Sequence, residues 1–182
     1  MRTMHAPQDG PEPDVLELLR RLPDGWALAP IFRLGKQGSD DGKKPVSDSR
    51  KRLFDAEECA GILQSDPETY GAVGVWLGPR SMGLVCLDID HEDGVAHILA
   101  KHGRDALPKT FCVASPRPGH YKYFYLVPTQ YWEKAANLSL KATGGVYELL
   151  WRDKQGIVLG AYATGGCYRW VEGVEALSEA PR

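Results

Sequence analysis

Two carboxylates stand at alternate positions at the end of an apolar run, where Asp88 and Asp90 follow residues 83–87. Residues i and i+2 of a strand point to the same face, so both side chains project one way, about 7 Å apart along the strand. Like charges this close are tolerated when a divalent cation lies between them, and oxygen ligands suit Mg²⁺ or Mn²⁺ rather than Zn²⁺. The pattern therefore indicates a metal site at a strand end. In the competing interpretation, Asp90 begins a turn and caps a helix over residues 92–102, and Asp88 is merely exposed.

Two further residues are candidates for the same site. Glu148 is the single acid in the apolar stretch 146–151, and a carboxylate in such a strand is costly unless it is paired or bound to a cation. His120 begins a strand directly after Gly119, a residue that lets a ligand or another chain segment come close. The alternatives are an exposed glutamate on an edge strand and a hydrogen-bonded structural histidine.

Cationic side chains that suit phosphate occur in two loops. Arg117 lies on the tight turn 116–119 and carries a guanidinium suited to phosphate oxygens. Lys43 and Lys44 lie in the loop 35–45, which is rich in glycine and charge and could bring backbone N–H groups and lysines to a phosphate. An ordinary surface hairpin explains the same loop.

Composition limits the function classes. The 182 residues are enough for one domain with its own core, and 43% hydrophobic with 25% charged residues is usual for globular proteins. The net charge of −2 gives no overall attraction to nucleic acid, so such binding must come from local clusters such as 36–52 and 117–122. No stretch is long and apolar enough to span a bilayer and no signal pattern begins the chain, so we expect a cytoplasmic protein.

The four cysteines contain no C-x-x-C pair, which argues against a zinc ribbon and a disulfide framework. We interpret all of them as structural; they are Cys59, Cys86, Cys112 and Cys167.

The elements that must position these residues are mostly strands. Alternation and turn signals predict strands over 26–32, 71–78, 84–90, 111–115, 120–127, 146–151, 156–160 and 168–170, and helices over 14–22, 55–64 and 94–102. The strands over 71–78 and 84–90 are expected to form a hairpin. Consecutive strands are predicted to form hairpins, and the helices fall between these hairpins. This order indicates an α+β fold, in which helices flank a mostly antiparallel sheet. We expect a flexible tail over 1–13, one domain over 14–171 and a polar tail over 172–182.

Three tyrosines share one face of the strand 120–127, namely Tyr121, Tyr123 and Tyr125, while His120, Lys122 and Phe124 share the other. Such a stripe can stack bases or pack a core.

The chain carries three separated acids and one histidine, each on or beside a predicted strand. In this it resembles the primase–polymerase domain of the archaeo-eukaryotic primase superfamily, which is found at the N-terminus of phage and plasmid replication proteins. The resemblance covers about residues 26–170. Its acid-x-acid motif is similar to residues 84–90, its turn with histidine and an aromatic strand to 115–124, and its third acidic motif to 147–149. Gly42-Lys43-Lys44-Pro45, 74–78, 107–110 and 168–170 match further segments in order.

The resemblance implies an RRM-like catalytic core and a DNA primase or DNA polymerase, a nucleotidyltransferase. By this likeness Asp88, Asp90 and Glu148 would bind two Mg²⁺ or Mn²⁺ ions, without zinc, that activate a 3′-hydroxyl and stabilise the pyrophosphate leaving group. His120 and Arg117 would hold the phosphates of a dNTP or NTP, with Lys43 or Lys44 assisting. The implied partners are a single-stranded DNA template, a primer and a replicative helicase in the same chain or another.

The sequence departs from the family pattern at Pro118, where a serine is common, and over 160–162, where many relatives have a proline-containing segment.

Three other functions stay open. A non-catalytic module for single-stranded nucleic acid would use the tyrosine stripe and the basic loops. A small-molecule nucleotidyltransferase would use the same acids. A strand-nicking initiator requires paired histidines, and Gly119-His120-Tyr121-Lys122 supplies one.

Overall fold

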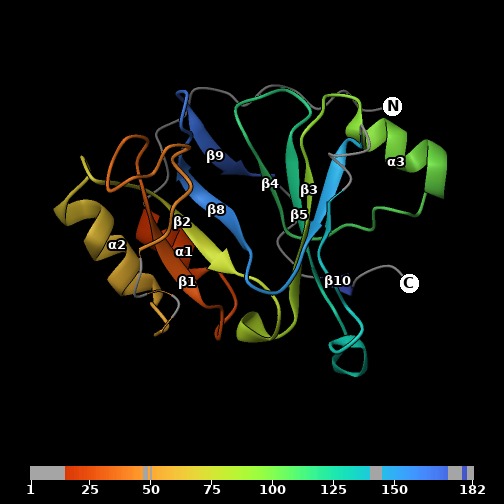
Figure 1. Cartoon of the computed structure of the whole chain (residues 1–182), viewed down its shortest axis with the longest axis horizontal. Coiled ribbons are helices and arrows are strands. Elements are labelled where there is room, and N and C mark those ends of the chain that lie inside the picture. Colours follow the sequence, from red (N-terminus) through yellow and green to blue (C-terminus); the bar gives the residue numbers. More distant parts are fainter. Residues whose placement is uncertain (1–14, 47–48, 50, 140–144, 172–177, 180–182) are drawn as a thin grey trace.

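The computed structural model of the chain describes residues 15–46, 49, 51–139, 145–171 and 178–179. Figure 1 shows an α+β architecture in which strands predominate. The helices are α1 (Val15–Arg20), α2 (Ala56–Ser65) and α3 (Gly94–His102), with short 3₁₀ turns η2 (Pro79–Ser81) and η3 (Thr129–Tyr131). The strands are β1 (Leu28–Phe32), β2 (Tyr70–Trp76), β3 (Leu84–Ile89), β4 (Cys112–Ala114), β5 (Tyr121–Leu126), β6 (Leu138–Ser139), β7 (Tyr147–Leu150), β8 (Gln155–Ala161), β9 (Cys167–Trp170) and β10 (Ser178–Glu179).

Within the described residues the ten strands form one sheet in the order β1-β2-β8-β9-β4-β5-β3-β7-β6. Every neighbouring pair along this path is antiparallel, and β10 adds a parallel pair at the end of β5. The predicted mostly antiparallel α+β fold is therefore confirmed. The sheet has two parts, β1-β2-β8-β9 and β4-β5-β3-β7-β6, joined where Val113 on β4 pairs with Trp170 on β9.

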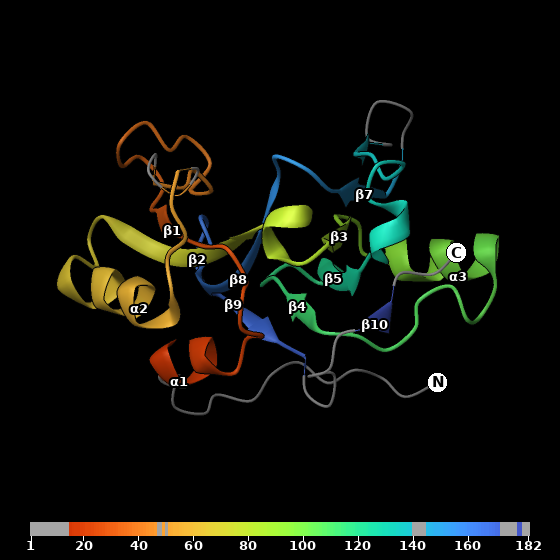
Figure 2. The same cartoon turned by 90° about the horizontal axis from the view of Figure 1, so that it is seen from below.

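The helices lie at opposite ends of the molecule. Figure 2 shows α1 and α2 beside the first part of the sheet and α3 beside the second. Helix α2 begins at Asp55, whose carboxylate accepts the N–H of Glu58 while the Glu58 carboxylate accepts the N–H of Asp55. This capping box confirms the start predicted from the sequence. None of the helices built from described residues has the length and apolar character that a bilayer crossing requires.

The predicted hairpin between residues 71–78 and 84–90 is wrong. Strand β2 pairs with β1 and β8, β3 pairs with β5 and β7, and only an isolated bridge from Gly78 to Leu84 joins the two segments. Between them the 3₁₀ turn η2 and the positive φ angles of Gly78, Met82 and Gly83 redirect the chain. The segment therefore carries the chain from one part of the sheet to the other, which makes β3 an interior strand.

Alternation along β3, β5 and β7 divides the apolar residues between two cores. Cys86 and Phe124 face the main core, where Phe124 lies 5.4 Å from Phe111 between ring centroids. Val85 and Tyr125 face a smaller core on the opposite side of the sheet. Because the side-chain period of a strand is two, the register of these strands decides which face every polar residue occupies.

The tyrosine stripe contributes to the smaller core. Tyr125 is buried there, its hydroxyl donates to the carbonyl of Pro108 at 3.1 Å, and Tyr123 packs against the same cluster. These two rings are packed within the protein, so the stripe gives little support for base stacking. The expectation of structural cysteines fits Cys59, Cys86 and Cys112, all buried thiols.

The predicted tails fall mostly outside the described residues, as do Asp14 and the whole of 1–13. Of the expected polar tail 172–182, Ser178–Glu179 is described and pairs in parallel with Tyr125 and Leu126. This short segment is part of the sheet, because the end of β5 offers it a backbone edge beyond β4.

Candidate active site

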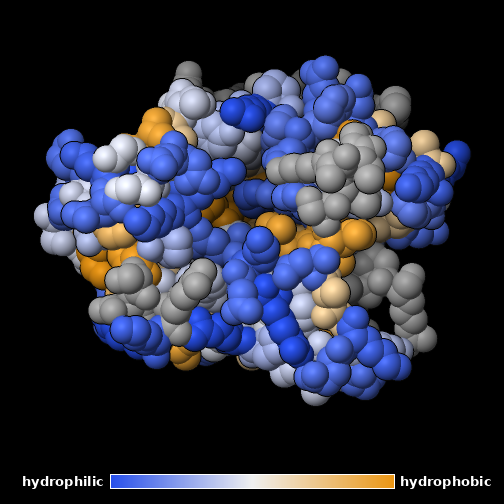
Figure 3. All heavy atoms as spheres, in the orientation of Figure 1, coloured by the Kyte–Doolittle hydropathy of each residue, from blue (hydrophilic) through white to orange (hydrophobic). Residues whose placement is uncertain are grey.

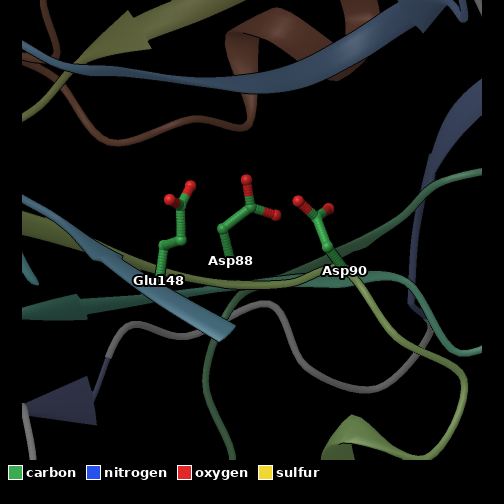
Figure 4. Close-up of side chains that lie close together, drawn as sticks. All are labelled: Asp88, Asp90 and Glu148. Carbon is green, nitrogen blue, oxygen red and sulfur yellow. The ribbon is translucent and has the colours of Figure 1, made fainter. Parts of the chain in front are cut away.

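Asp88, Asp90 and Glu148 lie together on one face of the sheet. Asp88 on β3 is directly opposite Glu148 on β7. Asp90 follows β3, where its N–H donates to the carbonyl of Val146 at 3.2 Å and continues the ladder by one residue. Figure 4 shows the three carboxylates side by side, pointing away from the sheet in the same direction. Each of the three residues offers one oxygen that lies within 4.8 Å of those offered by the other two.

The acids occupy the border of the main core. Asp88 is two residues along β3 from Cys86 in the main core, and Glu148 is two residues along β7 from Leu150, which is partly buried against that core. Asp88 is only 7% exposed, whereas Asp90 and Glu148 are half-buried. In the space-filling view, hydrophobic patches near the middle of the molecule lie among hydrophilic residues (Figure 3). The carboxylates therefore lie where the apolar interior gives way to solvent.

The donor set fits a hard divalent cation. Oxygens around a Mg²⁺ ion with bonds of about 2.1 Å are up to about 4.2 Å apart, so a small inward movement would bring these carboxylates into one coordination shell. All three donors are oxygens, which favours Mg²⁺ or Mn²⁺ over Zn²⁺. The competing interpretation of Asp90 as a helix cap fails, because α3 begins after Asp93 and no side chain caps it.

Lys122 is a member of the site that the sequence analysis did not single out. It pairs with Asp88 across β5 and β3, and its Nζ donates to Asp88 Oδ1 at 2.5 Å. Burial would lower the pKa of this ammonium, but the Asp88 carboxylate raises it and the net effect is a pKa above the usual value. Lys122 is therefore a charged lysine held beside the acids. The sequence places Lys122 on the same strand face as His120 and Phe124, which was the available indication of a role in the site. Only the register between β5 and β3 shows that Lys122 meets Asp88.

His120 lies beside Asp90, with 3.6 Å between His120 Nδ1 and Asp90 Oδ1. The turn before His120 comes close to the segment after Asp90 at Gly119, which has a φ of +74° and packs against Glu92. A Cβ atom at this position would lie 2.3 Å from the Glu92 Cα atom. The predicted close approach at this glycine is therefore made by another segment of the same chain, the one that follows Asp90. The His120 side chain is 18% exposed and can meet a ligand at the border.

Arg117 stands over an aromatic pair. Its Cζ atom lies 5.5 Å from the centre of the Tyr162 ring, and that ring meets Tyr168 edge-on with 5.3 Å between centroids. Burial raises the pKa of Tyr168 to about 12; Lys122 opposes the rise, while Tyr162, Asp88 and Asp90 add to it. Tyr168 is buried in the main core, the core whose border the acids occupy. The sequence analysis gave neither tyrosine a role in the site.

Lys43 and Lys44 lie on a neighbouring loop and do not join the acids in any described ion pair. Lys44 Nζ donates to the carbonyl of Gln37 at 2.6 Å, and the Lys43 N–H donates to Asp41 Oδ1 at 2.9 Å. At Gly42 an ideal Cβ would lie 3.1 Å from the Cβ of Ala163, so the loop packs beside the Tyr162 segment. A cavity of about 160 Å³ lies between these loops and includes Tyr162 but none of the acids. The described contacts of the lysines are therefore with their own loop and not with the carboxylates.

Comparison with known proteins gives one family. The model of the bifunctional DNA primase/polymerase, N-terminal, family matches residues 18–182, which include every residue of the site. No curated protein matched the chain.

Proposed function

The chain belongs to the family of bifunctional DNA primase/polymerase N-terminal domains, and from this premise we propose that it catalyses template-directed nucleotidyl transfer in DNA replication. The observation that carries the proposal is the convergence of Asp88, Asp90 and Glu148 in a chain that matches this family. The substrates would be a nucleoside triphosphate, a primer 3′-hydroxyl or a first nucleotide, and a single-stranded DNA template.

In this proposal Asp88, Asp90 and Glu148 hold the Mg²⁺ or Mn²⁺ ions of the reaction. Bound there, such ions would lower the pKa of the 3′-hydroxyl and neutralise charge on the phosphates. The 3′-hydroxyl would lose its proton to solvent water as its oxygen forms a bond to the α-phosphorus. The bond from that phosphorus to the α,β-bridging oxygen would break, and pyrophosphate would leave with the electron pair. Position and charge neutralisation are the main requirements of this chemistry, and three carboxylates at the border of the core can provide both.

The cationic residues would hold the triphosphate. His120 lies beside the acids, with its Nδ1 atom 3.6 Å from Asp90 Oδ1. Arg117 would bind phosphate oxygens with a guanidinium whose Cζ atom lies 5.5 Å from the centre of the Tyr162 ring. Lys43 and Lys44 would assist only at the far end of the ligand, because their loop contacts the Tyr162 segment rather than the acids.

The test is incorporation of labelled dNTP or NTP on a primed and on an unprimed single-stranded template, with Mg²⁺ or Mn²⁺ and with EDTA. We expect incorporation that requires the template and the metal, and that falls to background in Asp88→Asn. Asp93→Asn is the matched control, because Asp93 is exposed and makes no side-chain cap for α3. Equal incorporation by wild type and Asp88→Asn would refute the site assignment.

The same experiment separates the alternatives. Binding of single-stranded DNA that survives EDTA, without incorporation on any template, would identify a non-catalytic module. Nucleotidyl transfer to a small acceptor but not to a polymer would identify a small-molecule transferase.

A further inference from the structure

The two buried charged side chains among the described residues are partners. Asp88 is 7% exposed, Lys122 is 8% exposed, and 2.5 Å separates Lys122 Nζ from Asp88 Oδ1. Removing both charges from water is costly, and an apolar pair of similar volume commonly stabilises a fold at least as well. Stability alone therefore gives a weak reason for this pair, whereas its place in the acidic site suggests a role there.

The register places Asp88 between a positive and a negative neighbour. Lys122 is directly opposite it on β5, and Glu148 is directly opposite it on β7. The ammonium occupies one oxygen of Asp88, so a divalent cation between Asp88 and Glu148 must use the other oxygen or displace the lysine. Strand pairing fixes the backbone of Lys122 beside Asp88, and the burial of its side chain leaves the ammonium little room to move away.

Charge decides how many divalent cations such a site holds. Counted by themselves, Asp88, Asp90 and Glu148 carry three formal negative charges and Lys122 one positive charge, so these four side chains sum to −2. One divalent cation neutralises this charge. A second would have to bind without a compensating anion and close to a buried ammonium, where Coulomb repulsion is strong because the surroundings are poorly hydrated.

We propose that Lys122 is a built-in cation that limits the nucleotide-free site to one divalent ion and keeps the three acids together when no ion is bound. The inference rests on the proposed function in taking the acids as metal ligands. Lys122 is a positioning residue here, because its Nζ is buried against Asp88 and would have to break that pair to touch a substrate.

The experiment counts Mn²⁺ ions bound to the full chain without nucleotide, from the loss of the free Mn²⁺ signal in electron paramagnetic resonance. We expect one ion per chain for wild type. Lys122→Met keeps the length of the side chain without its charge, and we expect a second ion and an affinity for the first ion that is about tenfold higher. Lys101→Met, at an exposed position of α3, should behave as wild type. Two ions on wild type, or an unchanged count in Lys122→Met, would overturn the proposal.

Thermal unfolding gives a second measurement. Without metal, Lys122→Met leaves the Asp88 carboxylate buried and unpaired, so its Tm should fall below that of wild type and rise more on addition of Mn²⁺. If Lys122→Met does not fold, the wild-type count still decides, and Asp88→Asn with Lys122→Met, a neutral pair, should fold again. A double variant as unfolded as the single one would contradict charge compensation.

These readouts are independent of catalysis. A protein that binds one Mn²⁺ ion, gains a second in Lys122→Met and never incorporates nucleotide would uphold the role of Lys122 and refute the polymerase. Template-directed incorporation together with an ion count that is unchanged in Lys122→Met would uphold the polymerase and refute the role of Lys122.

Discussion

Asp88 and Glu148 are directly opposite each other in the antiparallel pair of β3 and β7. Directly opposed residues of such a pair have Cβ atoms about 4.5–5.5 Å apart, and like charges there are destabilising. Lys122 compensates the charge of Asp88 from the other side, and in the proposed function a cation would bridge the two carboxylates. Strand register, rather than a local motif, thus builds the acidic centre.

Neutralising either acid should abolish metal-dependent incorporation. We expect Asp88→Asn and Glu148→Gln each to reduce kcat/KM by at least about 100-fold, since a metal site contributes several kcal/mol to a transition state of this kind. Both variants should also lose the rise in Tm that Mn²⁺ produces in wild type. Asp93→Asn serves as the control, and a variant at 88 or 148 that keeps both activity and the Mn²⁺ shift would contradict the assignment.

Much of the site follows from the sequence because local patterns encode it. Alternation predicted β3, β5 and β7, and the acid-x-acid pair at the end of β3 indicated a metal site before any pairing was known. The pairing partners of β3 were not predictable, since β2 is adjacent in sequence and the turn 78–83 looks like a hairpin turn. Lys122 was missed for the same reason: its meaning depends on a register between strands that are distant in sequence.

Replacing His120 should weaken nucleotide binding more than metal binding. A hydrogen bond to a charged group is worth about 1.5–3 kcal/mol, so His120→Ala should raise KM for the triphosphate by about 10-fold to 100-fold. The Mn²⁺ affinity should change little, because the imidazole lies beside Asp90 and is not one of the three acids. His97→Ala, exposed on α3, is the control. If His120→Ala lost Mn²⁺ binding and kept an unaltered KM, His120 would be a metal ligand and not a triphosphate-binding residue.

Arg117 and Tyr162 should act as a unit. The Arg117 Cζ atom lies 5.5 Å from the centre of the Tyr162 ring, and a lysine lacks the planar guanidinium that interacts with an aromatic face. We expect Arg117→Lys and Tyr162→Ala to raise KM for the triphosphate with little effect on kcat, and Tyr162→Phe to behave as wild type. Steady-state kinetics on one primed template measures all three. A strong defect in Tyr162→Phe would show that the hydroxyl, rather than the ring, is the important group.

The buried thiols should make the fold sensitive to alkali. Burial raises the pKa of Cys59 and Cys112 from 9.0 to about 12 in each case. The folded state therefore keeps both thiols protonated while the unfolded chain ionises above about pH 9, so stability is complete below pH 9 and is lost progressively toward pH 12. Urea midpoints measured from pH 8 to 11 should fall, and less steeply in Cys59→Ala. A flat profile over this range in wild type would disprove the effect.

Gly119 should be essential because it sets the distance between two segments of the site. At this position an alanine would adopt a φ of +74° and bring its Cβ within 2.3 Å of the Glu92 Cα atom, so the turn with Arg117 and His120 would have to move away from the segment that follows Asp90. Gly103→Ala separates the two effects, since Gly103 has a φ of +96° and open space around it. With a ψ of 169°, Gly103 occupies a backbone region that is essentially limited to glycine, so we expect Gly103→Ala to cost about 1–3 kcal/mol of unfolding free energy with normal kinetics. Gly119→Ala should cost more and should also raise KM for the triphosphate, and equal behaviour of the two variants in stability and kinetics would show that the close approach to Glu92 has no part in positioning His120.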